Sequence, residues 1–280
     1  MAVVRAGLLG EILPAAQDTD MILEIVDVHL SFAGIKAIDG VSLRVHNGEL
    51  FAVIGPNGAG KTSIFNCISG VYRPQTGALR FMGNDLTRMR PHKIADMGVA
   101  RTFQNIELFP QMTVLDNLML GRHQHLHYGT AAAMVRIGKA QSEEGRNREI
   151  VEGIVEFLDI HQYRKAYVAM LPYGIQKRVE LGRALAMEPK LLLLDEPAAG
   201  MNLEETEDMA RFITDIRREL GIGIVLVDHD MRMVMDLADT ILAIDFGKPI
   251  ASGTPTEIQA NKDVIRAYLG QEHSIAGGTE

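Results

Sequence analysis

The sequence has few of the features that mark secreted, membrane-spanning or disordered chains. Its 280 residues include a single cysteine, Cys67, so an internal disulfide is excluded and a reducing compartment is favoured. No apolar run approaches the roughly 18 residues that span a bilayer, which excludes an integral membrane protein. Apolar residues make up 47% of the chain and charged residues 23%, so a buried core is expected and a wholly disordered chain is excluded.

The chain also lacks an excess of positive charge. It has 28 Lys and Arg against 36 Asp and Glu, a formal net charge of −8, and no basic stripe of the kind that binds nucleic acid. We therefore predict no nucleic-acid partner, and any anionic ligand must be held by local geometry. Residues 1–20 contain one cation, Arg5, and their apolar run is broken by Glu11, so we interpret them as a tail before the fold and not as a secretory signal.

Two kinds of strand are predicted. Apolar and polar residues alternate over 26–32 and again over 41–46, which is typical of half-buried antiparallel strands near the N-terminus. Continuous apolar runs at Leu50–Ile54, Leu191–Leu194 and Ile224–Val227 are typical of strands buried on both faces of a parallel sheet. The sequence therefore predicts an α/β fold with a mainly parallel core sheet.

Helical patterns separate these strands. Apolar residues at helical spacing between Met209 and Leu220 are followed by Gly221, a good helix C-cap, so a helix connects two parallel strands. Strand patterns are missing over 113–169. We expect one large domain over 21–270, with a core of 21–104 and 176–250, a helical insertion over 105–175 and a C-terminal extension over 251–280.

The strongest motif is a complete G-x-x-x-x-G-K-[ST] element between a predicted buried strand and a predicted helix, the context that a phosphate-binding loop requires. Glycines let backbone N–H groups surround phosphate oxygens, and the helix N-terminus adds positive partial charge. Lys61 can reach the β- and γ-phosphates, and the Thr62 hydroxyl can bind Mg²⁺. The alternative is a chance glycine-rich turn. The predicted nucleotide-binding residues are Gly55, Pro56, Asn57, Gly58, Ala59, Gly60, Lys61, Thr62 and Ser63.

Four further residues are candidates for the chemistry. Asp195 and Glu196 follow a buried strand, where the first acid can hold Mg²⁺ and the second can activate water; alternatively they are solvated loop carboxylates. His229, after the next such strand, can touch a γ-phosphate or be an ordinary surface histidine. Gln104 can contact Mg²⁺ or the attacking water.

The order of these motifs resembles the ATP-binding subunits of ABC transporters over about residues 22–270. The resemblance implies a P-loop NTPase of the ABC type, with an N-terminal antiparallel β subdomain and an inserted helical subdomain. It also implies that Phe32 stacks on adenine, that Glu196 is the catalytic base and that His229 senses the γ-phosphate. In that family two ATPase units form a head-to-tail dimer, and each supplies its signature segment to the ATP site of the other.

Within the family the chain is similar to the branched-chain amino-acid uptake type, and to the larger of its two ATPase subunits. The matching segments are 100–105, 113–122, 195–200, and 251–257 with 264–270. The resemblance implies two transmembrane permease subunits, a sister ATPase or a second copy of this chain, and indirectly a periplasmic or extracellular solute-binding protein. ATP and Mg²⁺ are the implied ligands, and the cytoplasmic face of the inner membrane is the implied location.

The signature segment departs from the family pattern Leu-Ser-Gly-Gly-Gln. Here it is Leu171-Pro-Tyr-Gly-Ile175, so proline replaces the serine that meets the partner's γ-phosphate, and only Gly174 remains for binding in trans. Loss of one neutral hydrogen bond costs about 1 kcal/mol, or about fivefold in affinity. We expect activity to persist, with the site built on Pro172–Ile175 less efficient than its mate. Asn202 stands where many relatives have aspartate.

Two other functions are weighed against transport. A soluble ABC-type ATPase of translation or DNA repair usually carries two ATPase units or a long coiled-coil insertion, and this chain has one unit and no heptad run. A P-loop kinase or GTPase would need an acceptor or base-specificity motif, which is not found. The sequence therefore favours an ATPase subunit that powers an importer.

Overall fold

The computed structural model describes residues 21–123 and 139–268, and these fall into two compact units. The sheet unit comprises the described residues up to Arg101, the segment Leu191–Glu196 and the described residues from Ile222 onward. The helical unit comprises Thr102–Lys190 and Pro197–Gly221. Within 21–123 and 139–268, no helix is both long and apolar enough to cross a membrane. The residue boundaries predicted for core and insertion stay a prediction.

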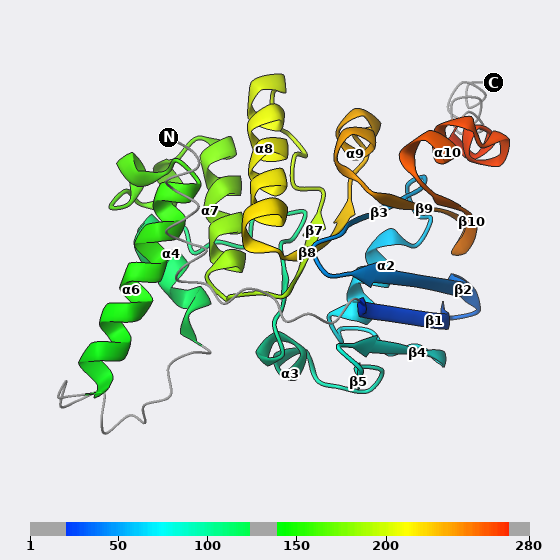
Figure 1. Cartoon of the computed structure of the whole chain (residues 1–280), viewed down its shortest axis with the longest axis horizontal. Coiled ribbons are helices and arrows are strands. Elements are labelled where there is room, and N and C mark those ends of the chain that lie inside the picture. The colour runs from blue at the N-terminus through cyan, green and yellow to red at the C-terminus, as the bar shows by residue number, and fades with distance from the viewer. Residues whose placement is uncertain (1–20, 124–138, 269–280) are drawn as a thin grey trace. The chain divides into compact units, whose positions relative to one another are not determined.

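The sheet unit contains a six-stranded sheet with the order β10-β9-β3-β8-β7-β6 (Figure 1). Five of its strands pair in parallel, and β10 pairs antiparallel with β9 at the edge. The three predicted apolar runs form its centre, so the prediction of a mainly parallel core sheet is confirmed. The strands are β3 Leu50–Ile54, β6 Val99–Arg101, β7 Leu191–Asp195, β8 Gly223–Val227, β9 Thr240–Asp245 and β10 Lys248–Gly253.

A second sheet is antiparallel, with the order β2-β1-β4-β5, as the N-terminal alternation predicts. Its strands are β1 Met21–Phe32, β2 Ile35–His46, β4 Thr76–Phe81 and β5 Asn84–Asp85. One detail differs from strict alternation: the pairing register shifts between Ile25 and Val28, and Asp27 has φ of 47°. Such a bulge turns the neighbouring side chains to the other face, so Val26 is exposed while Ile25 and Val28 are buried.

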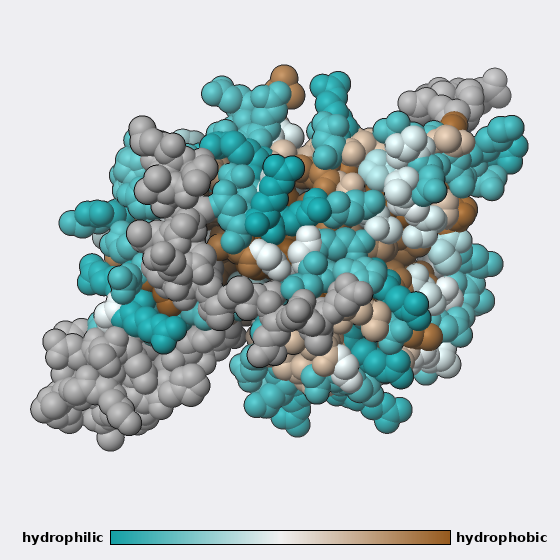
Figure 2. Space-filling view, in the orientation of Figure 1, coloured by the Kyte–Doolittle hydropathy of each residue, from teal (hydrophilic) through white to brown (hydrophobic). Residues whose placement is uncertain are grey.

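Buried side chains from both sheets form one core with the helix α2 (Lys61–Ile68). Phe65 and Ile68 of this helix are completely buried, and Cys67 is also buried there. The sheet unit also holds the short helices α3 (Pro91–Asp96), α9 (Met231–Leu237) and α10 (Pro255–Ala260). On the face of the molecule in Figure 2, most of the described surface is hydrophilic and apolar residues occur in small groups.

The helical unit is built from α4 (Val114–Gly121), α6 (Lys139–Phe157), α7 (Tyr173–Leu185) and α8 (Leu203–Leu220), with short 3₁₀ turns at His161–Tyr163 and Val168–Met170. Its apolar residues Val151, Ile154, Val155 and Leu158 recur at helical spacing and are at most 1% exposed. Gly221 ends α8 in the left-handed conformation with φ of 63°, as predicted for a C-cap. At the other end, Asn202 and Glu205 form a reciprocal capping box.

Close helix packing in this unit depends on a glycine at the end of α4. A Cβ added at Gly121 would overlap the Arg183 carbonyl oxygen and lie 2.9 Å from the Ala186 Cβ, so the two backbones leave no room for a side chain. The adjacent Arg122 is buried and donates to the Ala186 carbonyl (2.8 Å) while pairing with Glu188 (2.6 Å). The junction of α4 with the end of α7 therefore combines steric contact with buried charge.

We predict that Gly121→Ala destabilises the protein by about 1–3 kcal/mol, because the helices must separate to admit the methyl group. The matched control is Gly145→Ala on α6, where an added Cβ meets nothing within 4 Å. That change should stabilise the helix by up to about 1 kcal/mol. Thermal and urea unfolding of the two variants measures both effects, and equal midpoints for them would contradict the prediction.

Candidate nucleotide-binding site

The predicted phosphate loop lies between β3 and α2, with Gly60 as the N-cap of α2 at φ of 107°. A Cβ at Gly60 would overlap the Ala37 carbonyl oxygen, so only glycine fits there. The loop closes on itself through the Ala59 N–H, which donates to the Pro56 carbonyl at 3.1 Å. The turn at Gly247 is joined to it, since the Gly247 N–H donates to the Ala59 carbonyl at 2.9 Å. The loop is thus held in shape by main-chain contacts before any ligand binds.

The Lys61 side chain lies under this loop. Its Nζ donates to the carbonyl oxygens of Gly55 (2.6 Å) and Pro56 (2.9 Å). Burial lowers the pKa of Lys61, and the negative charges of Glu196 and Asp195 oppose that shift. The structure therefore brings Lys61 together with both predicted acids. Of the other loop residues, Asn57, Gly58 and Thr62 are exposed, and Ser63 is half-buried.

The two acids lie at the carboxyl end of β7. Asp195 is the last residue of the strand, and Glu196 follows with φ of 50°, a strained conformation for a residue with a side chain. The Glu196 N–H donates to the Val227 carbonyl of β8 at 2.7 Å, which holds it in that conformation. His229 follows β8, and its Nδ1 lies 3.6 Å from Glu196 Oε2 and 3.7 Å from Asp228 Oδ1.

Arg101 is a residue of this site that the sequence analysis missed. From the end of β6, its Nη2 donates to Asp195 Oδ2 at 2.8 Å, and both side chains are buried. Its Nη1 donates to Asn66 Oδ1 of α2 (2.7 Å) and to Oγ of Ser69, the C-cap of that helix (3.2 Å). A buried carboxylate needs a cation or several hydrogen-bond donors nearby. Arg101 ends the strand that pairs with β7, so its position in the sequence could have indicated a partner for Asp195.

The residues present fit a hard divalent cation such as Mg²⁺. Thr62 offers an exposed hydroxyl, and Asp195 offers a carboxylate at the edge of the sheet where the phosphate loop begins. Among the described residues, no group of three His, Cys, Asp or Glu side chains could form a metal site built from protein alone. Mg²⁺ is usually bound by one or two protein oxygens together with substrate phosphates and water, which matches this donor set.

Phe32, the predicted adenine-stacking residue, ends β1 with 45% of its surface exposed. Its ring packs edge-on against Tyr72, with ring centroids 5.0 Å apart and planes inclined by 67°. This edge-to-face contact fixes the ring from one side while nearly half of the residue stays exposed, as a stacking role requires.

Gln104 belongs to the helical unit, where its side chain is exposed and its main chain is fixed from α7. The Lys177 ammonium donates to the carbonyls of Gln104 (2.9 Å) and Phe103 (3.3 Å), and Glu180 accepts the Phe103 N–H (3.3 Å). Lys177 and Glu180 are both 2% exposed and pair at 3.4 Å. Burial raises the pKa of Glu180, while Lys177 lowers it. The buried ion pair of Lys177 and Glu180 on α7 thus positions the segment that carries Gln104.

The signature segment begins α7. Pro172 is the N-cap, without a side-chain cap bond, and Tyr173 donates through its hydroxyl to the Ala199 carbonyl at 3.1 Å. Gly174 is buried, and a Cβ there would overlap the Glu205 carboxylate. Asn202, the other departure noted in the sequence, caps α8 by accepting the Glu205 N–H at 3.0 Å.

Comparison with known proteins identifies the family. Residues 38–199 match the family model described as ABC transporter. The high-affinity branched-chain amino acid transport ATP-binding protein BraF of Pseudomonas aeruginosa is 40% identical over 250 residues, which cover 89% of this chain and 98% of BraF. The chain belongs to the ABC transporter family.

Other comparisons agree with this ABC ATPase assignment. The transport ATP-binding protein LivG of Escherichia coli (strain K12), described like BraF, is 36% identical over 89% of this chain and 98% of LivG. A solved ADP-bound conformation of an ABC transporter cassette has a TM-score of 0.78 and 28% identity, covering 90% of this chain and all of that one. The predicted fold class is confirmed, and the chain is an ATPase that couples ATP hydrolysis to transport. These relatives do not favour the alternative in translation or DNA repair.

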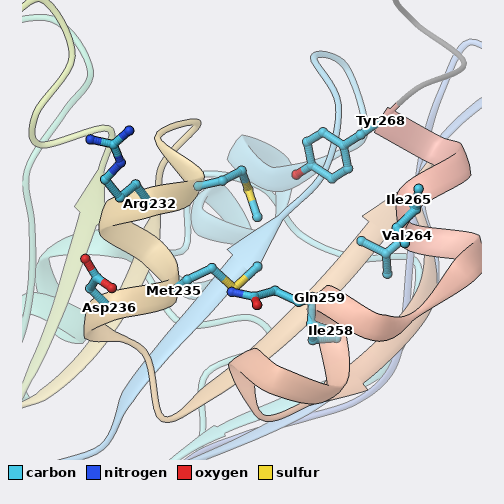
Figure 3. A pocket seen from close by; sticks show the side chains of 9 residues that line it. Arg232, Met235, Asp236, Ile258, Gln259, Val264, Ile265 and Tyr268 are labelled. Atoms are coloured by element: carbon cyan, nitrogen blue, oxygen red, sulfur yellow. The ribbon is translucent and has the colours of Figure 1, made fainter.

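A second family model, described as branched-chain amino acid ATP-binding cassette transporter, matches residues 248–274 of this ABC ATPase. Within that range, Tyr268 reaches the phosphate loop: its hydroxyl accepts a hydrogen bond from the Gly55 backbone, and burial raises its pKa to about 12. Tyr268 lines a pocket of about 530 Å³ between α9 and the C-terminal helix, and its hydroxyl points away from the helix that carries it (Figure 3). The sequence pattern gave no sign of this contact.

We predict that Tyr268→Phe weakens ATP binding by about fivefold, since one hydrogen bond to the start of the phosphate loop, worth about 1 kcal/mol, is lost. KM for ATP should rise while kcat stays near that of the native protein. A fluorescent ATP analogue measures the affinity cleanly because the chain has no tryptophan. Tyr163→Phe, a half-buried tyrosine of the helical unit, is the control, and an equal loss of affinity there would refute the assignment.

Proposed function

We propose that this ABC ATPase powers an importer of branched-chain amino acids or of related small amphipathic solutes. The observation that carries the proposal is the cluster at the carboxyl ends of β7 and β8, where Glu196 lies within 3.6 Å of His229 and its charge reaches Lys61. The solute class rests on the C-terminal match to the branched-chain model and on the names of BraF and LivG.

Nucleotide binding follows from the shape of the phosphate loop. Phe32 stacks on adenine, and backbone N–H groups of 57–62 surround the β- and γ-phosphates, with the N-terminus of α2 adding its dipole. Lys61 turns from the carbonyls of Gly55 and Pro56 to the phosphates, which replaces two neutral acceptors by charged ones. Thr62 and Asp195 would hold Mg²⁺. When bound, this ion neutralises charge that develops on the phosphates.

Hydrolysis requires a base beside the γ-phosphate. The backbone of Glu196 is fixed by its hydrogen bond to the Val227 carbonyl. Its carboxylate is therefore positioned to accept a proton from the attacking water. His229 lies between Glu196 and Asp228 and is exposed over 63% of its side chain, so it can turn to a γ-phosphate oxygen.

A second ATPase unit completes each site. We assign Gly174 and the N-terminus of α7 to the ATP bound by the partner, which is a second copy of this chain or a sister ATPase. Because Pro172 contributes no hydroxyl, the site built on this segment is the weaker of the two. The structure supports the assignment only through the position of Gly174 at the start of α7.

The permease contact is assigned to a patch in the helical unit made of Phe109, Tyr167 and Met170. These side chains are exposed over 54%, 50% and 77% of their surfaces. Their two segments are joined by the bridge of Thr113 with Tyr167 and by the Ala169 N–H, which donates to the Pro110 carbonyl at 3.1 Å. Two permease subunits, reached at the cytoplasmic face of the membrane and served outside by a solute-binding protein, would cover this patch.

We predict that Glu196→Gln lowers kcat by about 100-fold or more, because an amide cannot accept the proton of the attacking water. ATP affinity should persist, so the variant accumulates as an ATP-bound dimer visible by size-exclusion chromatography. Glu207→Gln makes the same change at an exposed carboxylate of α8 and should hydrolyse ATP at the native rate. Normal turnover by Glu196→Gln would remove Glu196 from the mechanism.

We predict that Met170→Asp reduces permease capture by about tenfold, since a charge in the middle of an apolar contact is desolvated without a partner. The measurement is affinity purification of the tagged chain from detergent-solubilised native membranes, with mass spectrometry of what is retained. Val71→Asp, at an apolar residue of the sheet unit exposed over 56%, is the control. Recovery of ribosomal or DNA-repair proteins without a permease would refute the transport proposal.

A further inference from the structure

Asp195, the acid assigned to Mg²⁺, already has a cation. The Arg101 guanidinium lies 2.8 Å from its Oδ2, and the two side chains are only 8% and 6% exposed. A pair so well removed from water is weakly screened, so the interaction of its charges is strong compared with that of a surface ion pair. Any divalent cation that approaches Asp195 therefore meets a carboxylate whose charge is largely balanced.

The guanidinium is anchored independently of Asp195. Its Nη1 donates to Asn66 of α2 and to Ser69, the residue that caps α2, and its guanidinium carbon lies 5.5 Å from the centre of the Phe65 ring. Its backbone is fixed as well, because Arg101 pairs with Leu193 in the parallel ladder of β6 and β7. These contacts all come from the helix that follows the phosphate loop or from the central sheet. Arg101 is therefore held beside Asp195 by contacts that do not involve the carboxylate.

The charges around the loop support a specific role. Lys61 and Arg101 are the cations that the structure places against Asp195 and Glu196. The formal charges of these four groups cancel, and the buried Asp228, whose Oδ1 lies 3.7 Å from His229 beside Glu196, adds one further negative charge. Removing the guanidinium would leave two carboxylates and one ammonium, and such an arrangement attracts a small divalent cation to oxygen ligands. A nucleotide adds several negative charges at once and so restores the attraction even with Arg101 in place.

We propose that Arg101 is a resident counter-ion of Asp195 that prevents the nucleotide-free site from binding a divalent cation, so that Mg²⁺ enters only together with the phosphates. The inference rests on the proposed nucleotide site and adds an order of binding to it. Arg101 acts through Asp195 and is therefore a positioning residue. An ion pair needed only for folding would affect stability without changing the affinity of the empty site for a cation.

The experiment measures Mn²⁺ binding by electron paramagnetic resonance, with Mn²⁺ alone as the probe and no nucleotide. The native chain should bind Mn²⁺ weakly, and Arg101→Met should bind it at least about tenfold more tightly. The double variant Arg101→Met/Asp195→Asn should lose the gain, which locates it at Asp195. Arg101→Lys, which keeps the charge, should bind Mn²⁺ as weakly as the native chain.

Two results would overturn the inference. One is tight binding of Mn²⁺ by the native chain without nucleotide, a measurement that needs no variant to fold. The other is equal Mn²⁺ affinity of the native chain and a folded Arg101→Met. Binding of ATP by the native chain is measured separately with the fluorescent analogue. Its absence would refute the proposed nucleotide site, whereas its presence beside either adverse Mn²⁺ result would refute the role of Arg101 alone.

Discussion

Buried charge at the carboxyl ends of parallel strands is the constraint on which the rest of this structure depends. Lys61, Asp195 and Arg101 are almost enclosed, and each would be costly to bury alone. The fold resolves this by bringing β6 and β7 and the start of α2 to one place, where each charge finds a partner. Two carbonyls of the phosphate loop serve Lys61 in the same way. The arrangement keeps a highly charged site folded in the absence of its ligand.

The helical unit also contains a buried pair of opposite charges. Lys177 and Glu180 are buried one turn apart on α7, and between them they bond the main chain at Phe103 and Gln104. A loop that must present Gln104 outward is thereby fixed through its backbone, which leaves the amide side chain exposed. The pair costs desolvation and is weak evidence for added stability, so its value lies in fixing one conformation of this segment.

Local patterns were sufficient to predict the phosphate loop, the parallel strands and the Gly221 cap, because each depends on residues adjacent in sequence. The bulge that exposes Val26 was not predictable, since its register is decided by pairing of β1 with two other strands. The contacts of Arg101 with Asp195 and of Tyr268 with Gly55 join residues 94 and about 200 positions apart, and no spacing rule connects them. Roles of the individual site residues stay predictions, although the geometry brings Lys61, Asp195, Glu196 and His229 together.

Asn202, a departure from the family pattern, and Gly174, the retained glycine of the signature, are connected through one carboxylate. Asn202 accepts the Glu205 N–H, and Glu205 accepts the Asn202 N–H in return, so the capping box fixes the Glu205 side chain. Its Oε1 then occupies the space where a side chain at position 174 would begin. A larger residue at position 174 would have to displace this carboxylate and disturb the cap of α8, so glycine is favoured there by packing within this chain as well. An asparagine serves this cap as well as an aspartate does, so the departure at position 202 leaves the glycine of the signature in place.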